Sequence, residues 1–178
     1  MERPPRLVLT GAAGFLGKRL IERLAGPWQI EAIDREPPVA GMLAHRPEVR
    51  WHRIDINDDT AVTSLFAALR ADGGATAVVH LAAHYDFTGE RHPDYQRTNV
   101  EGTRRLLDAC DGLGLERFVF ASSLAACEFP RAGRMLDESS PPGSGFLPDV
   151  CVEWEAAAAP ARAAGIRVVH PRLGLVLA

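Results

Sequence analysis

The sequence predicts an α/β fold in which a doubly wound parallel sheet carries helices on both faces. Short apolar stretches with the character of strands alternate with stretches whose apolar residues recur at helical spacing. Of the 178 residues 47% are hydrophobic, which is enough to bury a sizeable core within one domain. Because no repeat or linker divides the chain, we expect residues 1–178 to form a single domain.

The first predicted strand, Arg6–Leu9, runs directly into a glycine-rich turn and a helix. Gly11, Gly14 and Gly17 stand at three-residue spacing, and apolar residues then follow at helical spacing. In a dinucleotide site one such glycine makes the tight turn, one admits the pyrophosphate and one lets helix and strand pack closely. The pattern therefore predicts a Rossmann-type nucleotide site, formed by Gly11, Ala13, Gly14, Phe15, Leu16 and Gly17.

An acidic residue closes the second predicted strand, Gln29–Ile33. Asp34 lies about 20 residues after the glycine turn, where a carboxylate accepts hydrogen bonds from the adenosine ribose. Its negative charge would repel a 2′-phosphate, which favours NAD over NADP. The neighbouring Arg35 could hold that phosphate, so NADP stays open as the less favoured cofactor.

The remaining elements continue the alternation. Further strands are predicted at Val49–Ile54, Ala77–Ala82, Phe118–Ala121 and Arg167–His170. Helices are predicted at Asp58–Leu69, Asn99–Leu113 and Phe146–Ala164, and a long loop at Cys127–Gly145. In such a fold the ligand crevice lies at the carboxyl ends of the strands.

Composition argues against several classes of partner. The net charge is −3 with scattered charges, so we expect no nucleic-acid partner. No apolar run has membrane-spanning length and no signal peptide precedes the first strand, so a cytoplasmic protein without membrane contact is expected. Cys110, Cys127 and Cys151 are far apart, which favours reduced, buried thiols.

Three histidines lie near one another in the sequence, namely His80, His84 and His92. The sequence shows no acidic or cysteine partner that would complete a ligand set with them. We therefore expect no metal site.

With these elements placed, the chain resembles the extended short-chain dehydrogenases, the NAD-dependent epimerase/dehydratase group. The resemblance rests on five motifs in order: Thr10–Gly17, Asp55-Ile56, His80–Ala83, Thr98–Thr103 and Phe118–Ser123. It implies that Asp55 and Ile56 bracket the adenine ring and that Ser123 assists catalysis. It also implies that the cofactor contacts Leu81, Ala82, Ala83, Asn99 and Ser122.

The chain departs from this group at the catalytic pair. The group carries Tyr-x-x-x-Lys about 25 residues after the serine, where the lysine lowers the pKa of the tyrosine. Here Leu147 and Cys151 occupy those positions, and Lys18 is the one lysine of the chain. Residues from Gly145 onward resemble an epimerase subgroup that also lacks the pair. Tyr85, just beyond the fourth strand, is the candidate phenol.

Two functions remain open after this reading. One is an epimerase, dehydratase or reductase that moves a hydride between NAD and a small substrate such as a sugar nucleotide. The other is a dinucleotide-binding module without turnover. The sequence ends where the group continues into a substrate lobe, so we expect that lobe to be absent or truncated. The resemblance also implies a homodimer through the helices around Val100 and Val150.

Overall fold

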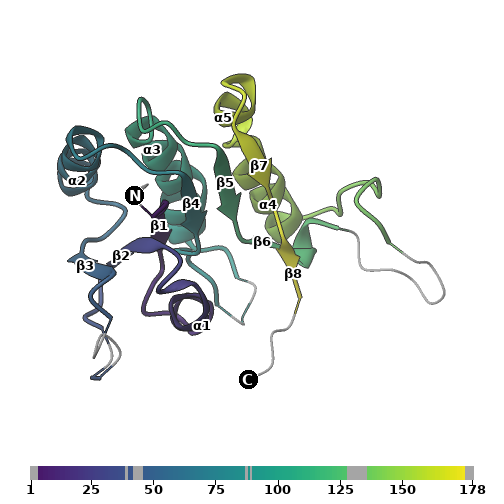
Figure 1. Cartoon of the computed structure of the whole chain (residues 1–178). Helices are drawn as coiled ribbons and strands as arrows, with labels where there is room; N and C mark the ends of the chain where they lie inside the picture. The colour runs from purple at the N-terminus through teal and green to yellow at the C-terminus, as the bar shows by residue number, and fades with distance from the viewer. Residues whose placement is uncertain are drawn as a thin grey trace.

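A computed structural model describes residues 4–38, 40–41, 46–86, 88, 90–127 and 136–174. Its main sheet has six parallel strands in the order β3-β2-β1-β4-β5-β7 (Figure 1). The strands are β1 (Arg6–Thr10), β2 (Gln29–Asp34), β3 (Val49–Arg53), β4 (Ala77–His80), β5 (Arg117–Phe120) and β7 (Arg167–Val169). The strand order reverses between β1 and β4, which confirms the doubly wound topology predicted from the sequence.

In the described residues the strands are connected by α-helices α1 (Phe15–Leu24), α2 (Asp59–Ala71), α3 (Gly102–Ala109), α4 (Phe146–Ala156) and α5 (Ala159–Ala163). Helix α2 begins where expected, because the Asp58 carboxylate accepts a hydrogen bond from the Ala61 N–H at 3.0 Å. Since Asp58 caps this helix, the nearby Asp55 is not its cap.

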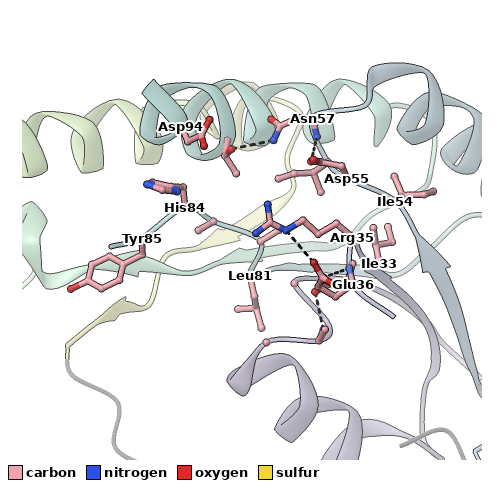
Figure 2. Close-up of a pocket in the computed structure, with 18 residues that line it drawn as sticks. Ile33, Arg35, Glu36, Ile54, Asp55, Asn57, Leu81, His84, Tyr85 and Asp94 are labelled. Atoms are coloured by element: carbon pink, nitrogen blue, oxygen red, sulfur yellow. Dashed lines mark hydrogen bonds and ion pairs between the residues drawn. The ribbon is translucent and has the colours of Figure 1, made fainter. Parts of the chain in front are cut away.

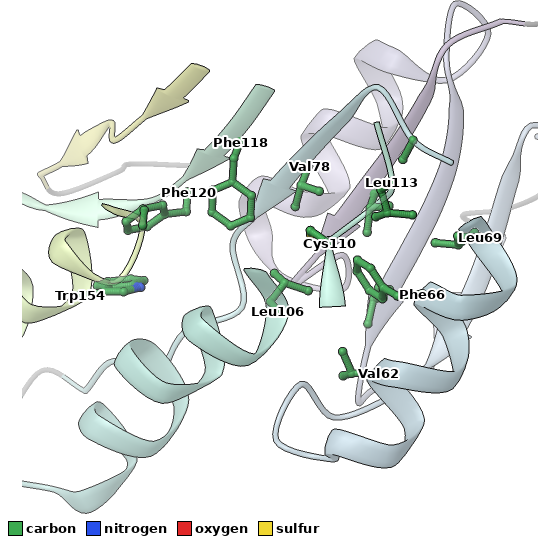
Figure 3. Packing of buried hydrophobic residues seen from close by; sticks show 14 of the residues in the cluster. Val62, Phe66, Leu69, Val78, Leu106, Cys110, Leu113, Phe118, Phe120 and Trp154 are labelled. Carbon is green, nitrogen blue, oxygen red and sulfur yellow. The ribbon is translucent and has the colours of Figure 1, made fainter. Parts of the chain in front are cut away.

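Alternate residues of the strands face two separate cores, one on each side of the sheet. Val8, Val78 and Phe118 pack against helices α2, α3 and α4, as Figure 3 shows for the residues around Phe66. Leu7 and Ile30 point to the opposite face, where α1 covers them. Helices therefore lie on both faces of the sheet, as the sequence predicts.

Two predicted helices have different boundaries in the structure. The predicted helix Phe146–Ala164 is divided into α4 and α5, because Pro160 stands in the first turn of α5 and cannot donate a backbone hydrogen bond within a longer helix. The predicted helix Asn99–Leu113 becomes α3, preceded by a π-helical stretch, η1 (Tyr95–Glu101). Such π-helical stretches are rare in proteins, and those that occur often lie at functional sites.

A small parallel pair of strands was not predicted. It joins β6 (Ser122–Ser123) to β8 (Arg172–Leu173) beyond the end of β5. The predicted strand Ala77–Ala82 ends earlier, at His80. Most of the loop predicted at Cys127–Gly145 lies outside the described residues, which resume at Leu136. No helix of the described chain is both long and apolar enough to cross a membrane.

Candidate functional site

A cavity of about 420 Å³ opens at the carboxyl ends of β1, β2, β3 and β4 (Figure 2). Eleven residues that the sequence analysis assigned to a cofactor or to catalysis line it: Gly11, Ala13, Gly14, Asp34, Arg35, Asp55, Ile56, Leu81, Ala82, Ala83 and Tyr85. These come from four separate segments of the chain. The parallel sheet brings them together, because all four segments follow strands that end at the same edge.

The glycine turn is packed too closely to admit side chains. Gly11 has a φ of +70°, and a Cβ there would lie 2.7 Å from the Ala82 nitrogen. A Cβ on Gly17 would lie 2.3 Å from the Gly11 carbonyl oxygen. Gly14 is less confined, since its Cβ would meet that same oxygen at 3.1 Å. Gly11 and Gly17 thus permit close packing of the backbone, and Gly11 and Gly14 line the cavity.

Helix α1 begins at this turn, and no side chain caps it. The first N–H groups of a helix lack intrahelical partners and carry partial positive charge. Phe15, Leu16 and Gly17 form the first turn, and none of the three lines the cavity. Only their backbone N–H groups are therefore suited to an anionic ligand.

Asp34 holds the glycine turn from the end of β2. Its carboxylate accepts hydrogen bonds from the Ala13 N–H at 2.8 Å and from the Glu36 N–H at 3.0 Å. The Arg35 side chain is 75% exposed, lines the same end of the cavity and has its nitrogen Nε 4.0 Å from a Glu36 carboxylate oxygen. This end therefore offers both a carboxylate and a guanidinium.

The segment after β3 forms a further wall. Asp55 accepts a hydrogen bond from the Asn57 N–H at 2.8 Å, and the Asn57 amide donates to Thr98 Oγ1 at 3.1 Å. Thr98 belongs to η1, so this bond connects the β3 segment to the π-helix. Seven lining residues were missed by the sequence analysis: Ile33, Glu36, Ile54, Asn57, His84, Asp94 and Thr98. Six of them directly adjoin predicted residues, Asp94 being the exception, and that proximity was the available signal.

Asn99 does not line the cavity, but it contacts the backbone of His84, which does. It is buried, its Oδ1 accepts from the His84 N–H at 2.7 Å, and its Nδ2 donates to the His84 carbonyl at 3.0 Å. Both hydrogen bonds fix the backbone of the loop that follows β4. Tyr85 is next in this loop, 62% exposed, and lines the cavity.

Ser122 and Ser123 also lie outside the cavity lining. The buried Ser122 hydroxyl donates to Glu155 at 2.7 Å, and Arg172 donates to both oxygens of that carboxylate, each at 2.8 Å. Burial raises the pKa of Glu155, but the hydrogen bonds from Arg172 and Ser122 outweigh this effect and leave it below its ordinary value. This cluster ties α4 to the β6–β8 pair.

Cys151 occupies the position where the resembled group carries its lysine. The side chain is buried, and this burial together with the nearby Glu155 carboxylate raises the pKa of the thiol to about 11. The thiol is therefore protonated at neutral pH and serves as a packing group, as expected from the sequence. Cys110 and Cys127 are likewise buried and unpaired.

A buried histidine joins the sheet to two helices. His80 is fully buried, and burial lowers its pKa to about 4, so the ring is neutral at pH 7. Thr103 donates to the Asn99 carbonyl at 2.6 Å and accepts from Trp154 at 2.8 Å, so His80 Nε2 must donate to it at 3.1 Å. The other ring nitrogen then accepts from the Thr10 hydroxyl at 2.6 Å.

The structure places an acidic side chain beside two of the histidines, which the sequence reading did not recognise. His84 and His92 do have an acidic partner, because one ligand atom from each of His84, His92 and Asp94 lies within 4.8 Å of the others. Asp94 follows His92 by two residues, and the loop after β4 folds so that His84 lies beside this pair. His84 and Asp94 line the cavity, beside Tyr85.

The fold and this cavity define a dinucleotide-binding α/β domain, and comparison with known proteins gives its family. The chain belongs to the NAD dependent epimerase/dehydratase family, whose model matches residues 7–176.

Two relatives illustrate the range of the similarity. An epimerase family protein of Mycobacterium leprae is 29% identical over 97% of this chain and 53% of its own length. A dTDP-glucose 4,6-dehydratase of Streptomyces griseus is 34% identical over 66% of this chain and 37% of its own length. The chain thus spans about half or less of these relatives.

Solved structures agree with the fold. The UDP-glucose 4-epimerase of Thermus thermophilus, in complex with NAD, matches 94% of this chain and 54% of its own with a TM-score of 0.77 and 27% identity. The likeness therefore includes the sheet and the helices that build the cavity.

The lowered pKa of His80 predicts a pH dependence of folding stability. Between pH 6.5 and 4 the unfolded chain binds a proton that the folded chain excludes, so stability falls as the pH falls through this range. From pH 7.5 to pH 5 this histidine should cost about 2 kcal/mol of the free energy of unfolding. Urea unfolding at both pH values measures it.

The control for this prediction is His80→Gln. In this variant the free energy of unfolding should fall by about 2 kcal/mol less between pH 7.5 and pH 5 than in the wild type. Burial and the nearby Arg162 also lower the pKa of His170 to about 4. The variant His170→Gln therefore measures the contribution of His170 to the same pH dependence. An unchanged pH dependence in His80→Gln would show that His80 does not exclude the proton.

Proposed function

We propose that the cavity binds NAD and that residues 1–178 form the dinucleotide-binding domain of an epimerase, dehydratase or reductase. The observation that carries the proposal is a glycine turn with no room for side chains at Gly11, next to the uncapped N-terminus of α1. The Asp34 carboxylate accepts a hydrogen bond from the Ala13 N–H of this turn. A side chain at Gly14 would enter the space beside the glycine turn where a pyrophosphate would lie. The first N–H groups of α1, which have no intrahelical partner, suit the negative charge of that pyrophosphate.

The lining segments follow neighbouring strands of the sheet, so each would contact a different part of the cofactor. Asp34 and Arg35 would meet the adenosine ribose, Asp55 and Ile56 the adenine ring, and the loop after β4 the middle of the dinucleotide. His84 and Tyr85 lie toward the other end of the cavity in Figure 2. When bound, NAD supplies a hydride acceptor for a carbinol carbon of the substrate.

The chain's own residues provide part of the remaining chemistry. Tyr85 brings a phenol to the cavity, whereas Ser123 lies in β6 and does not line it. Neither Leu147 nor the protonated thiol of Cys151 can replace the Tyr-Lys pair in moving a proton. The substrate in this proposal is a sugar nucleotide or another small molecule with a carbonyl or hydroxyl group.

Gly14→Val should abolish cofactor binding, because the new side chain would occupy the space between the glycine turn and the pyrophosphate. NADH and NADPH are titrated separately, with energy transfer from the tryptophans and calorimetry as readouts. Wild-type protein should bind NADH more tightly than NADPH, since the Asp34 carboxylate disfavours a 2′-phosphate.

Ala163→Val, on the exposed surface of α5, is the matched control and should bind as the wild type does. Equal NADH affinity in Gly14→Val and wild type would remove the cofactor from this cavity. Absence of NADH binding by the wild type would overturn the proposal itself.

The absent Tyr-Lys pair favours a second candidate, a dinucleotide-binding module without turnover. A panel of sugar nucleotides and small carbonyl compounds, assayed by NADH absorbance, separates the two. If the chain is an enzyme, Ser123→Ala should lower turnover by roughly a hundredfold and leave NADH affinity unchanged. Ser64→Ala, exposed on α2, should alter neither quantity. Tight NADH binding with no turnover on the panel supports the module.

A homodimer through α3 and α4 completes the proposal. Val100 and Val150 are buried within the chain, so other side chains must form the interface. Val152 on α4 is 44% exposed and is an apolar group available for it. Light scattering should give a dimer for the wild type and a monomer for Val152→Glu, with Glu153→Gln as control. A monomeric wild type, or a dimeric Val152→Glu, would contradict this interface.

A further inference from the structure

The cavity carries a cluster of possible metal ligands at the end remote from Ile33 and Glu36 (Figure 2). One ligand atom each from His84, His92 and Asp94 lies within 4.8 Å of the others. In the dinucleotide proposal none of these three side chains is required for NAD. The cluster is therefore a feature that the proposed function leaves unexplained.

His84 is held in place by its surroundings. Two hydrogen bonds with the buried Asn99 side chain fix its backbone. Tyr95 packs edge-on against its ring with centroids 4.8 Å apart. A histidine fixed in this way has lost most of its rotational freedom before any ligand arrives, which lowers the cost of binding one.

The Nε2 atom of this fixed ring is buried and has no hydrogen-bond partner within the described chain. Such an atom costs free energy unless a ligand or another group satisfies it. The nearest charge is the Asp86 carboxylate, with an oxygen 3.7 Å away, beyond hydrogen-bond distance. The Tyr95 hydroxyl accepts from the Asp86 N–H at 3.3 Å, so η1 positions this residue as well.

We propose that His84, His92 and Asp94 bind a divalent transition-metal ion, with zinc as the best match. Two imidazoles and one carboxylate form a set that zinc prefers, and three protein ligands leave a fourth position open. Asp86 and Asp94 together carry two negative charges, which would neutralise the ion. These carboxylates also make the cluster unsuitable for a phosphate or another anion.

The cluster needs a small contraction to hold the ion. With metal–ligand distances of about 2.0–2.1 Å, tetrahedral ligand atoms stand about 3.3 Å apart. The present separations of up to 4.8 Å must therefore shrink by about 1.5 Å at most. His92 and Asp94 supply this movement, because their side chains are 48% and 36% exposed. The His92 ring, which stacks on His84 with centroids 4.7 Å apart and accepts a hydrogen bond from the Asp94 N–H, must also rotate to face the ion.

The open position would face the cavity, since His84 and Asp94 both line it. A metal ion there could take water or an oxygen atom of a small molecule and act as a Lewis acid. The Tyr-x-x-x-Lys pair that would normally polarise a substrate oxygen is absent from this chain. That role depends on the proposed function, whereas binding of the ion does not.

Calorimetric titration of the full chain with ZnCl₂ tests the site, on protein without a polyhistidine tag and after treatment with a chelator. One equivalent should bind, and His92→Ala and Asp94→Asn should each weaken binding by roughly tenfold or more. Glu90→Gln changes an acid of the same loop outside the cluster and should bind zinc as the wild type does.

Cobalt gives a second readout, because Co²⁺ bound through imidazole nitrogens in a four-coordinate site has an intense visible spectrum. The spectrum should appear in the wild type and in Glu90→Gln and be lost in His92→Ala. His92 is half exposed, so its replacement leaves the fold intact, which circular dichroism verifies. Failure to bind zinc, or equal affinity in wild type and His92→Ala, would overturn the proposal.

The outcome is independent of the dinucleotide experiment. Zinc binding without NADH binding would overturn the proposed function and keep the metal site. NADH binding without zinc binding would do the opposite.

Discussion

The fold and the cavity both depend on the buried hydrogen-bond chain centred on His80. It runs from Trp154 on α4 through Thr103 on α3 to the ring, and from the ring to Thr10 at the end of β1. The Thr10 hydroxyl accepts from the Ala82 N–H at 3.2 Å, which sets the backbone that faces Gly11. A neutral imidazole can donate and accept at once, so a single side chain links both helices to the glycine turn.

The two ends of the cavity have different chemical character. At the glycine turn the backbone itself lines the cavity, because Gly11 and Gly14 bring no side chain there, and the Asp34 and Arg35 side chains lie beside it. Around His84 the side chains are the binding surface, and buried groups of η1 position them. The π-helical stretch serves both ends, because Thr98 contacts Asn57 while Asn99 holds His84. With no Tyr-Lys pair on α4, the phenol and the imidazole among the described lining residues both come from the loop after β4, in Tyr85 and His84.

The elements that sequence reasoning found are those set by local patterns. Short apolar runs located β1 and β5, an alternating run located β2, and apolar residues at helical spacing located α2. The boundaries that failed depend on single backbone groups: Pro160 interrupts the last predicted helix, and an extra residue per turn in η1 displaces the start of α3. The site residues missed, such as Asn57 and Asp94, adjoin elements but belong to no motif.

The sequence by itself determined the family, the parallel sheet and the nucleotide end of the cavity. The family resemblance rests on five motifs in order along the chain. The sheet and the nucleotide end of the cavity follow from apolar strand patterns, glycine spacing and an acid at the end of β2. Only the tertiary structure decided that Ser122 pairs with Glu155, that Ser123 lies outside the cavity lining and that Asp94 joins His84 and His92. The physical reason is that these relations depend on how a loop folds back over a helix. Packing sets that path, and no fixed spacing along the chain encodes it.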